Sequence, residues 1–203
     1  MDLVFDHFKK IFNENGYRLY MIGSSSRDYL LGNKIRDYDF VSDATPLEIS
    51  KFLEVSKAFI KYGVCQTKYN DIKIDLVTLR KESEYKDSRH PSKIEFIKDI
   101  NIDYLRRDFT INAIYIDENY NIIDPSNGFN DLKNRYLRFI KDPLISINED
   151  PLRILRCYRF IKEYNLNIDE NVLKLLKDNE YLLEKLNKDK IKEEERKYKE
   201  YDK

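Results

Sequence analysis

Two aspartates separated by one residue, Asp37 and Asp39, are the side chains in this sequence best suited to chemistry. The residues around them, Tyr38, Phe40 and Val41, predict a strand that carries both carboxylates. Residues two apart on a strand point to the same face and lie roughly 6 to 7 Å apart along it. Two carboxylates in this arrangement can hold divalent metal, as two-metal phosphoryl and nucleotidyl transfer requires.

A run of small residues precedes the carboxylates. The apolar residues 19–22 predict a buried strand that ends at Gly23, and residues 24–26 are all serine. Small side chains let a phosphate approach backbone N–H groups where a helix begins. We therefore predict that Gly23 and Ser24 bind phosphate and that Arg27, in the first turn of the helix that follows, clamps it.

A second constellation occupies residues 106–113, Arg-Arg-Asp-Phe-Thr-Ile-Asn-Ala. Adjacent arginines point in different directions on a helix, so we predict that Arg107 alone of the two faces a ligand and clamps phosphate. Asp108 and Asn112 are four residues apart and would share one helix face, where they could hold a ribose hydroxyl. The alternative is a surface salt bridge, which is the commoner role of an isolated run of this kind.

A third constellation begins at Asp150. Pro151 suits the first position of a helix, so Asp150 is either the N-cap of that helix or a ligand-binding residue. Arg153, Arg156 and Arg159 then lie on one arc of the helix, opposite its apolar side chains. Like charges at this spacing repel one another unless an anion or RNA lies across them. The pattern favours a ligand-binding face, and a solvated face is the alternative.

Asp75 belongs to an alternating run, residues 72–79, and lies on the face opposite Ile72 and Ile74. It is either a third carboxylate near the metal site or an exposed strand residue, and the alternation does not decide between the two. The residues that follow, 80–91, are dense in charge and without periodicity, which is typical of a solvated loop.

These motifs resemble the signature of the polymerase-beta-like nucleotidyltransferases, and more narrowly that of class II CCA-adding enzymes and bacterial poly(A) polymerases. Residues 23–32 resemble the pattern Gly-Gly-x-x-Arg-Asp-x-Leu-Leu-Gly, and Asp37 and Asp39 match Asp-x-Asp. Ser24 stands in place of the second glycine, where its side chain could crowd a triphosphate or add a hydroxyl donor to it. Residues 106–113 match the family's motif without a change, and residues 149–153 resemble its Glu-Asp-x-x-Arg motif. Residues 80–91 resemble the family's flexible loop, which is associated with accepting ATP.

The resemblance implies a role for each motif. Asp37 and Asp39 would be catalytic and bind Mg²⁺, and Gly23, Ser24, Arg27 and Arg107 would hold the triphosphate. Asp150 and Arg153 would read the Watson–Crick edge of the incoming base and select C and A, in place of a nucleic-acid template. The remaining nucleotide contacts would come from Asp108, Asn112, Arg156 and Arg159.

The reaction implied is the addition of CMP and AMP, from CTP and ATP, to the 3′ end of tRNA with release of pyrophosphate. A poly(A) polymerase or an enzyme that adds only A is the nearest alternative, because the same motifs serve both. A nucleotide- or RNA-binding module without turnover is the alternative from another class. The presence of both Asp37 and Asp39 argues against that module, because close carboxylates repel and have little structural use without a cation.

Composition excludes several other classes of protein. The 203 residues contain 37 basic and 37 acidic side chains, so no global positive field attracts nucleic acid, and any RNA site must be a local patch. Cys65 and Cys157 have no CxxC spacing, and the two histidines have no ligand partners nearby, so we predict neither a zinc site nor a disulfide framework. The N-terminus does not resemble a signal peptide, and no apolar run reaches membrane-spanning length, so we expect a cytoplasmic protein.

We expect an α/β (α+β) fold in which residues 1–140 form a polymerase-beta-like nucleotidyltransferase head with a mixed sheet. Residues 141–203 are expected to form a short all-helical neck with a charged tail. The coarse pattern predicts helices over residues 2–14, from Arg27 to Leu31 and from an N-cap at Thr45 through Leu53, and a solvated or fraying helix at 188–203. It predicts strands near 58–62, 64–68, 72–79 and 113–117, with a turn at residues 69–71. By the resemblance, we expect the family's body and tail domains to be absent from these 203 residues, and a homodimer would be one way to compensate.

Overall fold

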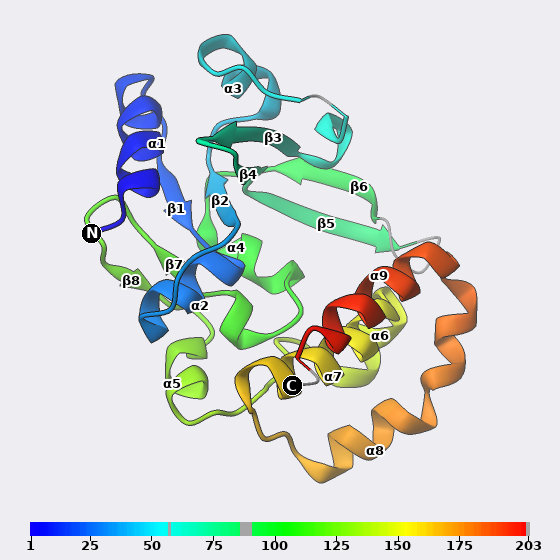
Figure 1. Ribbon diagram of the computed structural model, residues 1–203. Helices are drawn as coiled ribbons and strands as arrows, with labels where there is room; N and C mark the ends of the chain where they lie inside the picture. The colour runs from blue at the N-terminus through cyan, green and yellow to red at the C-terminus, as the bar shows by residue number, and fades with distance from the viewer. Residues whose placement is uncertain (57, 86–90, 202–203) are drawn as a thin grey trace. The chain divides into compact units, whose positions relative to one another are not determined.

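A computed structural model describes residues 1–56, 58–85 and 91–201 of the chain (Figure 1). The chain divides into two compact units, which are described separately. Unit 1 comprises Met1–Glu82, Ile94–Arg107 and Asn112–Gly128, and unit 2 comprises Ser83–Lys93, Asp108–Ile111 and Phe129–Lys203. The division into a head and a neck at residue 140 remains a prediction, because the two units do not follow one continuous boundary.

Unit 1 contains a mixed sheet of six strands in the order β3-β4-β2-β1-β7-β8. Strands β2 and β4 run parallel, whereas the other neighbouring strands pair antiparallel. The mixed α/β architecture predicted from the sequence is therefore confirmed. The strands are β1 (Leu19–Met21), β2 (Tyr38–Ser42), β3 (Val64–Tyr69), β4 (Ile72–Thr78), β7 (Tyr115–Ile116) and β8 (Ile122–Ile123).

The hairpin of β3 and β4 is closed by a two-residue turn at Asn70 and Asp71, whose φ angles are 49° and 64°. Asn and Asp tolerate this left-handed conformation, which matches the twist of the flanking strands. The turn fixes the register so that Lys68 lies opposite Lys73 and Gln66 opposite Asp75. The sequence-based predictions of the turn and of both strands are confirmed.

Two helices cover one face of this sheet. The predicted N-terminal helix is present as α1 (Leu3–Glu14), and α3 (Pro46–Phe52) begins with the predicted Thr45 cap, which forms a capping box with Glu48. Both helices pack on the apolar side chains of β2 and β4 in one cluster, and α1 lies beside β1 in Figure 1. The cluster includes Phe5, Phe8, Phe12, Phe40, Ile49, Ile74 and Leu76.

Helix α2 (Gly23–Leu31) starts directly after β1, four residues before the predicted start at Arg27. The predicted strand near residues 58–62 is wrong, because Ile60–Tyr62 forms a 3₁₀ turn that ends at Gly63. The charged segment expected to be a solvated loop instead contributes two strands, β5 (Arg80–Tyr85) and β6 (Pro91–Phe96), which pair as a separate sheet. Residues 86–90 of the predicted flexible loop lie outside the described residues.

Residues 106–113 do not form the single helix that was expected. Helix α4 (Ile100–Asp103) continues into a 3₁₀ turn, Tyr104–Arg106, after which Arg107 is extended, and a second 3₁₀ turn covers Thr110–Asn112. Asp108 and Asn112 therefore do not share a helix face, and they belong to different units. Their joint role in holding a ribose has no support in this local geometry.

Helices dominate the part of unit 2 that follows residue 128. The aromatic core of unit 2 is formed by Phe109, Phe139 and Phe160. The ring centroid of Phe109 lies 4.6 Å from that of Phe139 and 5.6 Å from that of Phe160. The elements are α5 (Gly128–Lys133), α6 (Pro143–Glu149), α7 (Leu152–Tyr164), α8 (Glu170–Asp178), a 3₁₀ segment (Glu180–Lys185) and α9 (Lys188–Lys199).

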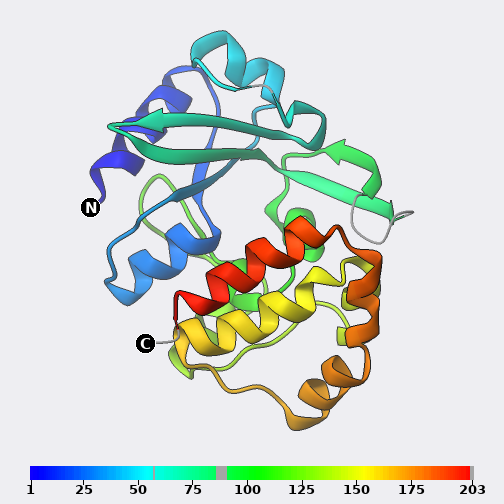
Figure 2. The same ribbon diagram turned by 45° about the vertical axis from the view of Figure 1, so that its right-hand side comes forward.

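The charged tail was expected to be solvated or fraying, but α9 packs along α7, as both ribbon views show (Figures 1 and 2). Its Glu194 is only 3% exposed and pairs with Arg159 of α7. A mostly charged helix is thus held by one buried ion pair together with a contact of Lys162 on the ring of Tyr198.

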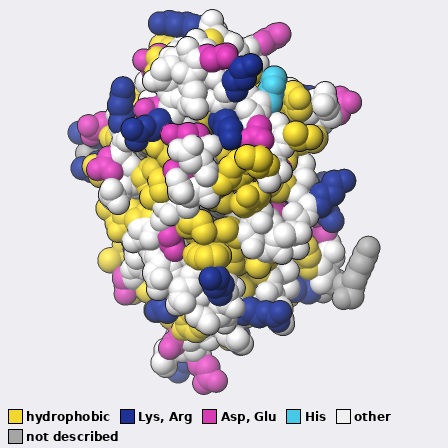
Figure 3. Space-filling view, turned by 90° about the vertical axis from the view of Figure 1, so that its left-hand side faces the viewer, with side chains coloured by type: hydrophobic (Ala, Val, Ile, Leu, Met, Phe, Trp, Pro, Cys, Tyr) yellow, Lys and Arg dark blue, Asp and Glu magenta, His cyan; other side chains and the backbone are white. Residues whose placement is uncertain are grey.

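Basic and acidic side chains are interspersed on the face drawn in Figure 3, in keeping with their equal numbers in the sequence. Cys65 and Cys157 are buried free thiols, and burial raises the pKa of Cys157. Within the described part of the chain, no helix has the length and apolar character needed to cross a bilayer.

Candidate functional site

Asp39 is held by the start of α2. Gly23 adopts a φ of +63°, and a Cβ added to it would lie 2.9 Å from Asp39 Oδ2, so this close approach requires glycine. Ser24 donates two hydrogen bonds to the same oxygen, from its backbone N–H (3.1 Å) and from Oγ (2.6 Å). The backbone N–H of Asp39 in turn donates to Ser25 Oγ at 2.6 Å. The predicted phosphate-binding turn and the predicted metal-binding strand are therefore in direct contact.

The two predicted catalytic carboxylates occupy different local positions. Asp39 is half-buried within β2, whereas Asp37 is exposed and lies one residue before the strand begins. The prediction that both residues lie on the strand is thus correct for Asp39 only. The Oγ of Ser25 lies 3.4 Å from the backbone oxygen of Asp37, so the same serine spans both residues.

Asp75 lies on β4 directly beside Asp39, since the two residues are register partners in the parallel pair. Its carboxylate accepts hydrogen bonds from Gln66 Nε2 at 2.8 Å and from Lys73 Nζ at 2.9 Å. Among the described residues, no group of three or more Asp, Glu, His or Cys side chains is arranged to hold a metal ion. Asp75 therefore lies beside the carboxylate pair, and its own two oxygens already bind Gln66 and Lys73.

Lys73 lies in the field of all three carboxylates. Burial by itself lowers the pKa of Lys73, but its hydrogen bond to Asp75 and the nearby negative charges raise the pKa above the ordinary value. Asp37 and Asp39 both contribute to this effect. The charged form of the Lys73 side chain is thus stabilised beside Asp37 and Asp39.

The residues present fit a hard divalent cation. Carboxylate oxygens are the donors that Mg²⁺ and similar ions prefer, and the missing side chain of Gly23 leaves room beside Asp39 that a Cβ would fill. Asp37 and Asp39 are the side chains that would hold the ion.

Arg27, predicted to clamp phosphate, is 3% exposed and lies in the second turn of α2. Its Nη1 donates to Asn112 Oδ1, so two predicted nucleotide-binding residues contact each other within unit 1. Asn112 therefore orients the guanidinium of Arg27. Contact of either side chain with a nucleotide remains a prediction.

Arg107 and its neighbour Arg106 both bind Asp103, a fully buried residue that the sequence analysis missed. Asp103 also accepts from Tyr115 Oη at 2.7 Å and from the backbone N–H of Arg80 at 3.0 Å. Burial alone would raise the pKa of Asp103, but the charges of Arg106 and Arg107 hold it well below its ordinary value. The spacing of three and four residues between Asp103 and these arginines was a signal that could have identified the pair of salt bridges.

In unit 2, two nitrogens of Arg156 in α7 bind one carboxylate oxygen of Asp108. Asp108 Oδ2 lies 2.7 Å from Nε and 2.6 Å from Nη2. Burial lowers the pKa of Arg156, but the charges of Asp108 and Glu194 and the hydrogen bond to Asp108 together outweigh burial and raise it. Both nitrogens converge on one carboxylate oxygen, and hydrogen bonds between two charged groups are shorter and stronger than those between neutral groups. Asp108 therefore fixes Arg156.

The other two arginines of α7 also have carboxylate partners. Arg153, 6% exposed, donates to Ser146 Oγ at 2.8 Å and to Glu149 Oε2 at 3.2 Å. Arg159 pairs with Glu163 at 2.6 Å and with Glu194 at 3.0 Å. The repulsion that favoured a ligand-binding face is thus offset within unit 2 by protein carboxylates. The arginine row by itself no longer indicates a bound anion.

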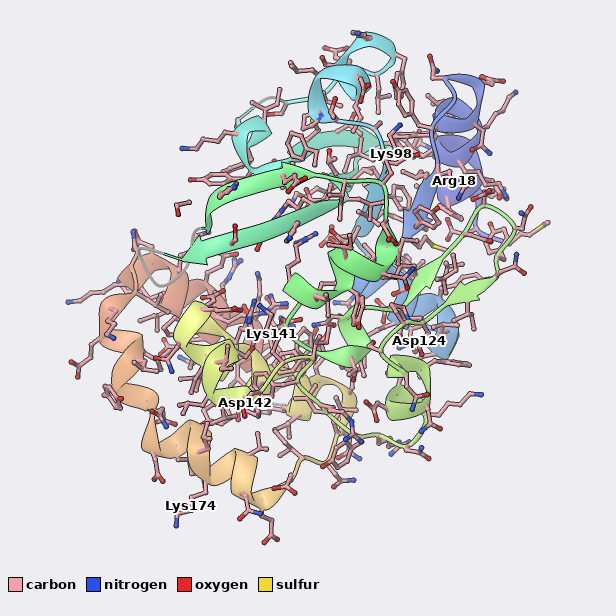
Figure 4. All side chains as sticks on the ribbon, turned by 180° about the vertical axis from the view of Figure 1, so that it is seen from behind. Arg18, Lys98, Asp124, Lys141, Asp142 and Lys174 are labelled. Carbon is pink, nitrogen blue, oxygen red and sulfur yellow. The ribbon has the colours of Figure 1, made fainter. Side chains whose placement is uncertain are left out.

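Asp150 lies between α6 and α7, where its Oδ1 accepts from the backbone N–H of Leu152 at 3.1 Å. Helix α7 begins at Leu152 with Pro151 in the N-cap position, so Asp150 lies one residue before the N-cap, although it binds the first N–H of the helix. A contact of Asp150 with a base remains a prediction. Both ends of the preceding helix, α6, are stabilised. Asp142 caps its first turn, and Lys141 forms a 2.6 Å ion pair with Glu149, its last residue. Figure 4 labels Lys141 and Asp142, the two residues that precede α6.

Comparison with known proteins identifies relatives of this arrangement. A CCA-adding enzyme of Lactobacillus helveticus is 36% identical over 180 residues, which cover 88% of this chain and 45% of that protein. The structure of the Bacillus stearothermophilus CCA-adding enzyme in complex with CTP superposes with a TM-score of 0.86 at 26% identity, covering 98% of this chain and 49% of the other. A tRNA nucleotidyltransferase complexed with a primer tRNA and an incoming ATP analogue gives 0.75 at 31% identity, covering 95% and 58%.

The chain thus spans about half the length of the curated relatives it matches. A family model described as the poly(A) polymerase head domain matches residues 19–138, which include Gly23, Asp37, Asp39 and the whole 106–113 motif. Because this match covers more than half of the chain, the protein belongs to the poly(A) polymerase head domain family.

Proposed function

We propose that this chain is a template-independent nucleotidyltransferase that adds CMP and AMP, from CTP and ATP, to the 3′ end of tRNA and releases pyrophosphate. The observation that carries the proposal is the contact between the start of α2 and Asp39, through Gly23 and Ser24. This contact joins a phosphate-binding element to a carboxylate suited to metal binding. The relatives named as CCA-adding enzymes support the choice of substrates.

Asp37 and Asp39 would hold a divalent cation, proposed to be Mg²⁺. When bound, such a cation supplies a Lewis acid that lowers the pKa of the attacking 3′-hydroxyl and neutralises charge on the leaving pyrophosphate. Ser24 fixes the orientation of Asp39, and the N-terminal end of α2 offers a positive dipole to the triphosphate. Arg27, oriented by Asn112, and Arg107, held by Asp103, add fixed positive charge.

Base selection is proposed for Asp150 and Arg153. Cytosine and adenine both present an amino group next to a ring nitrogen acceptor, whereas uracil and guanine present a carbonyl next to a ring N–H. A carboxylate accepts from the amino group, and a guanidinium donates to the ring nitrogen, so this pair suits C and A and rejects U and G. Ser146 and Glu149 hold the guanidinium of Arg153 in a fixed orientation, as such a reading requires.

The test is a primer-extension assay with Mg²⁺ on tRNAs that lack the whole CCA end, its last two nucleotides or its last nucleotide. Each RNA is offered CTP, ATP or both. Extension that proceeds to CCA and stops there, and that disappears in Asp37→Ala/Asp39→Ala with unchanged circular dichroism, is the expected result. Extension that is independent of Mg²⁺ would contradict the proposed cofactor.

A poly(A) polymerase or an A-only enzyme is the second candidate, favoured by the description of the matching family. It predicts a long A tail or a single A in the same assay. A chain that binds CTP and RNA without extending any RNA would instead be the non-catalytic module. The expectations of cytoplasmic localisation and of a homodimer belong to the same proposal, and sedimentation at several concentrations tests the second.

A further inference from the structure

We propose that Lys68 and Lys73, here called the strand lysines, bind the phosphodiester backbone of the RNA strand that is extended. This inference rests on the proposed function, because it identifies the side of Asp37 and Asp39 from which the acceptor strand approaches. The two lysines lie on neighbouring strands, β3 and β4, and are direct register partners.

The strand lysines share a face of the sheet with the carboxylates. Alternate residues of a strand point to the same side, so Lys73 lies on the side of Asp75, whose register partner on β2 is Asp39. Lys68 lies on the side of Gln66, which donates to Asp75. The opposite side of these strands packs against α1 and α3. The lysines and the carboxylates therefore form one continuous polar surface within unit 1.

With Asp37 and Asp39 assigned to the proposed cation, one carboxylate, Asp75, stands against the two ammonium groups of Lys68 and Lys73, so the lysine end of this surface favours a bound anion. Like charges placed directly opposite each other on neighbouring strands destabilise a sheet. Asp75 meets Lys73 at 2.9 Å, but half of the lysine side chain is exposed, and Lys68 is exposed at the other side of the pair. Neighbouring strands are only about 4.8 Å apart, so an anion that contacts both ammonium groups removes the repulsion between them.

The direction of the reaction indicates that this anion is the acceptor strand rather than the triphosphate. Strand β2, which carries Asp39, lies between β1 and β4 in the sheet. The proposed triphosphate site at Gly23 and Ser24 follows β1, whereas the strand lysines lie beyond β2 on the other side. In phosphoryl transfer the attacking and leaving oxygens are roughly in line. With pyrophosphate leaving on the β1 side, the attacking 3′-hydroxyl arrives on the β4 side.

Contacts of this kind position an RNA without reading its sequence, because lysine meets the backbone phosphate and not the base. The strand lysines therefore supply affinity and direction for the acceptor end, and base choice belongs to other residues. The inference predicts an ionic contribution to RNA binding from two lysines in a chain whose overall charge is zero.

The test measures binding of the full chain to a tRNA that lacks its last nucleotide, by fluorescence anisotropy over a series of KCl concentrations. Lys68→Gln/Lys73→Gln is compared with Lys10→Gln/Lys51→Gln, which removes the same charge from α1 and α3 on the opposite side of the sheet. Each phosphate contact contributes about 0.7 to 0.9 to the slope of log K against log salt concentration. We expect the strand-lysine variant to lose about 1.5 from that slope and about tenfold in affinity, with CTP binding within about twofold of wild type.

A second arm replaces the last phosphodiesters of the RNA with neutral methylphosphonates. The wild-type chain and the Lys10→Gln/Lys51→Gln control are expected to lose affinity for this RNA, and the strand-lysine variant is expected to be insensitive to it. The single variant Lys68→Gln changes an exposed residue of the edge strand β3 and is expected to show about half of the slope change, which guards against misfolding of the double variant.

Unchanged RNA affinity and salt slope in Lys68→Gln/Lys73→Gln would overturn the strand-lysine site and leave the proposed function intact. A wild-type chain that binds CTP but no RNA would overturn both. Equal losses in the two double variants would also reject the site, because the effect would then follow from net charge alone.

Discussion

The hydroxyl of Ser24 donates a 2.6 Å hydrogen bond to Asp39 Oδ2, and the backbone N–H of Ser24 donates a second bond to the same oxygen. In the family pattern that this segment resembles, the position is glycine, which offers the N–H alone. The serine therefore adds a hydroxyl that donates to the carboxylate of Asp39. The sequence had left open whether this side chain would crowd a triphosphate or contact it.

Replacing Ser24 with Gly or Ala should loosen Asp39, because each variant removes the hydroxyl and keeps the N–H. A hydrogen bond to a charged group contributes about 1.5 to 3 kcal/mol. We expect Mn²⁺ binding, followed by electron paramagnetic resonance without nucleotide, to weaken by about tenfold in both variants. Ser50→Ala, which removes a hydroxyl bonded within α3, serves as the control. Equal Mn²⁺ affinity in all four proteins would show that the hydroxyl has no part in holding the carboxylate.

Gly23→Ala should abolish nucleotide transfer at little cost to the fold. A Cβ at this position meets Asp39 Oδ2 at 2.9 Å, whereas a Cβ on Gly16, which has a similar φ of +81°, meets no atom within 4 Å. The left-handed conformation costs a non-glycine residue about 1 to 2 kcal/mol in either case. We expect Gly23→Ala and Gly16→Ala to lose comparable free energy of unfolding in urea. Only Gly23→Ala should lose about 100-fold or more in rate, because it displaces a catalytic group.

Asp103→Asn should destabilise unit 1 in a pH-dependent manner. The pKa of Asp103 is lower in the folded chain than the ordinary value of 3.8, because Arg106 and Arg107 outweigh the effect of burial. Its carboxylate therefore stabilises the fold above about pH 4, and this contribution is lost as the pH falls toward the folded pKa. We expect the variant to lose about 3 to 5 kcal/mol of unfolding free energy at pH 7.

The measurement is urea unfolding of wild type and Asp103→Asn at a series of pH values from neutral to acid. The difference between the two proteins should narrow as the pH falls, since the wild-type carboxyl becomes protonated and neutral like the amide. A difference that stays constant down to about pH 2 would contradict the assignment of Asp103 as the titrating group.

Glu194→Gln should release α9 from α7. The carboxylate is 3% exposed and meets Arg159 at 3.0 Å, so the variant removes the negative charge beside a guanidinium that is 11% exposed and leaves a neutral hydrogen-bond acceptor. We expect a loss of about 2 to 4 kcal/mol, measured by urea unfolding. The neighbouring Glu195 is exposed, and Glu195→Gln should change stability by less than about 0.5 kcal/mol. Similar losses in both variants would mean that the helix is held by its general charge and not by this pair.

Local signals in the sequence predicted the elements that carry the catalytic candidates. The alternation in β4 placed Asp75 opposite Ile74, and the turn at Asn70 and Asp71 was visible as a pair of residues that tolerate positive φ. The start of α2 was missed because the residue before it, Ile22, makes no side-chain cap, so the sequence lacks the usual marker of a helix start.

The sequence did not predict which residues far apart in the chain bind each other. Arg156 pairs with Asp108, 48 residues earlier, and Arg159 with Glu194, 35 residues later. Helical periodicity shows that the arginines share an arc and says nothing about what faces them. The same limit applies to Arg27, whose partner Asn112 lies 85 residues further along the chain. Motif similarity therefore located Arg27, Asp108 and Asn112 without revealing which residues they bind.

The two-residue turn at Asn70 and Asp71 restricts how this protein can change during evolution. Successive strand residues face opposite sides, so a one-residue slip in the pairing of β4 would turn Lys73 and Asp75 toward α1 and bring Ile74 out beside Asp39. A longer turn is therefore compatible with the site only where it leaves the strand register unchanged. Selection on folding and catalysis should thus act on the register of this hairpin more strongly than on the length of its turn.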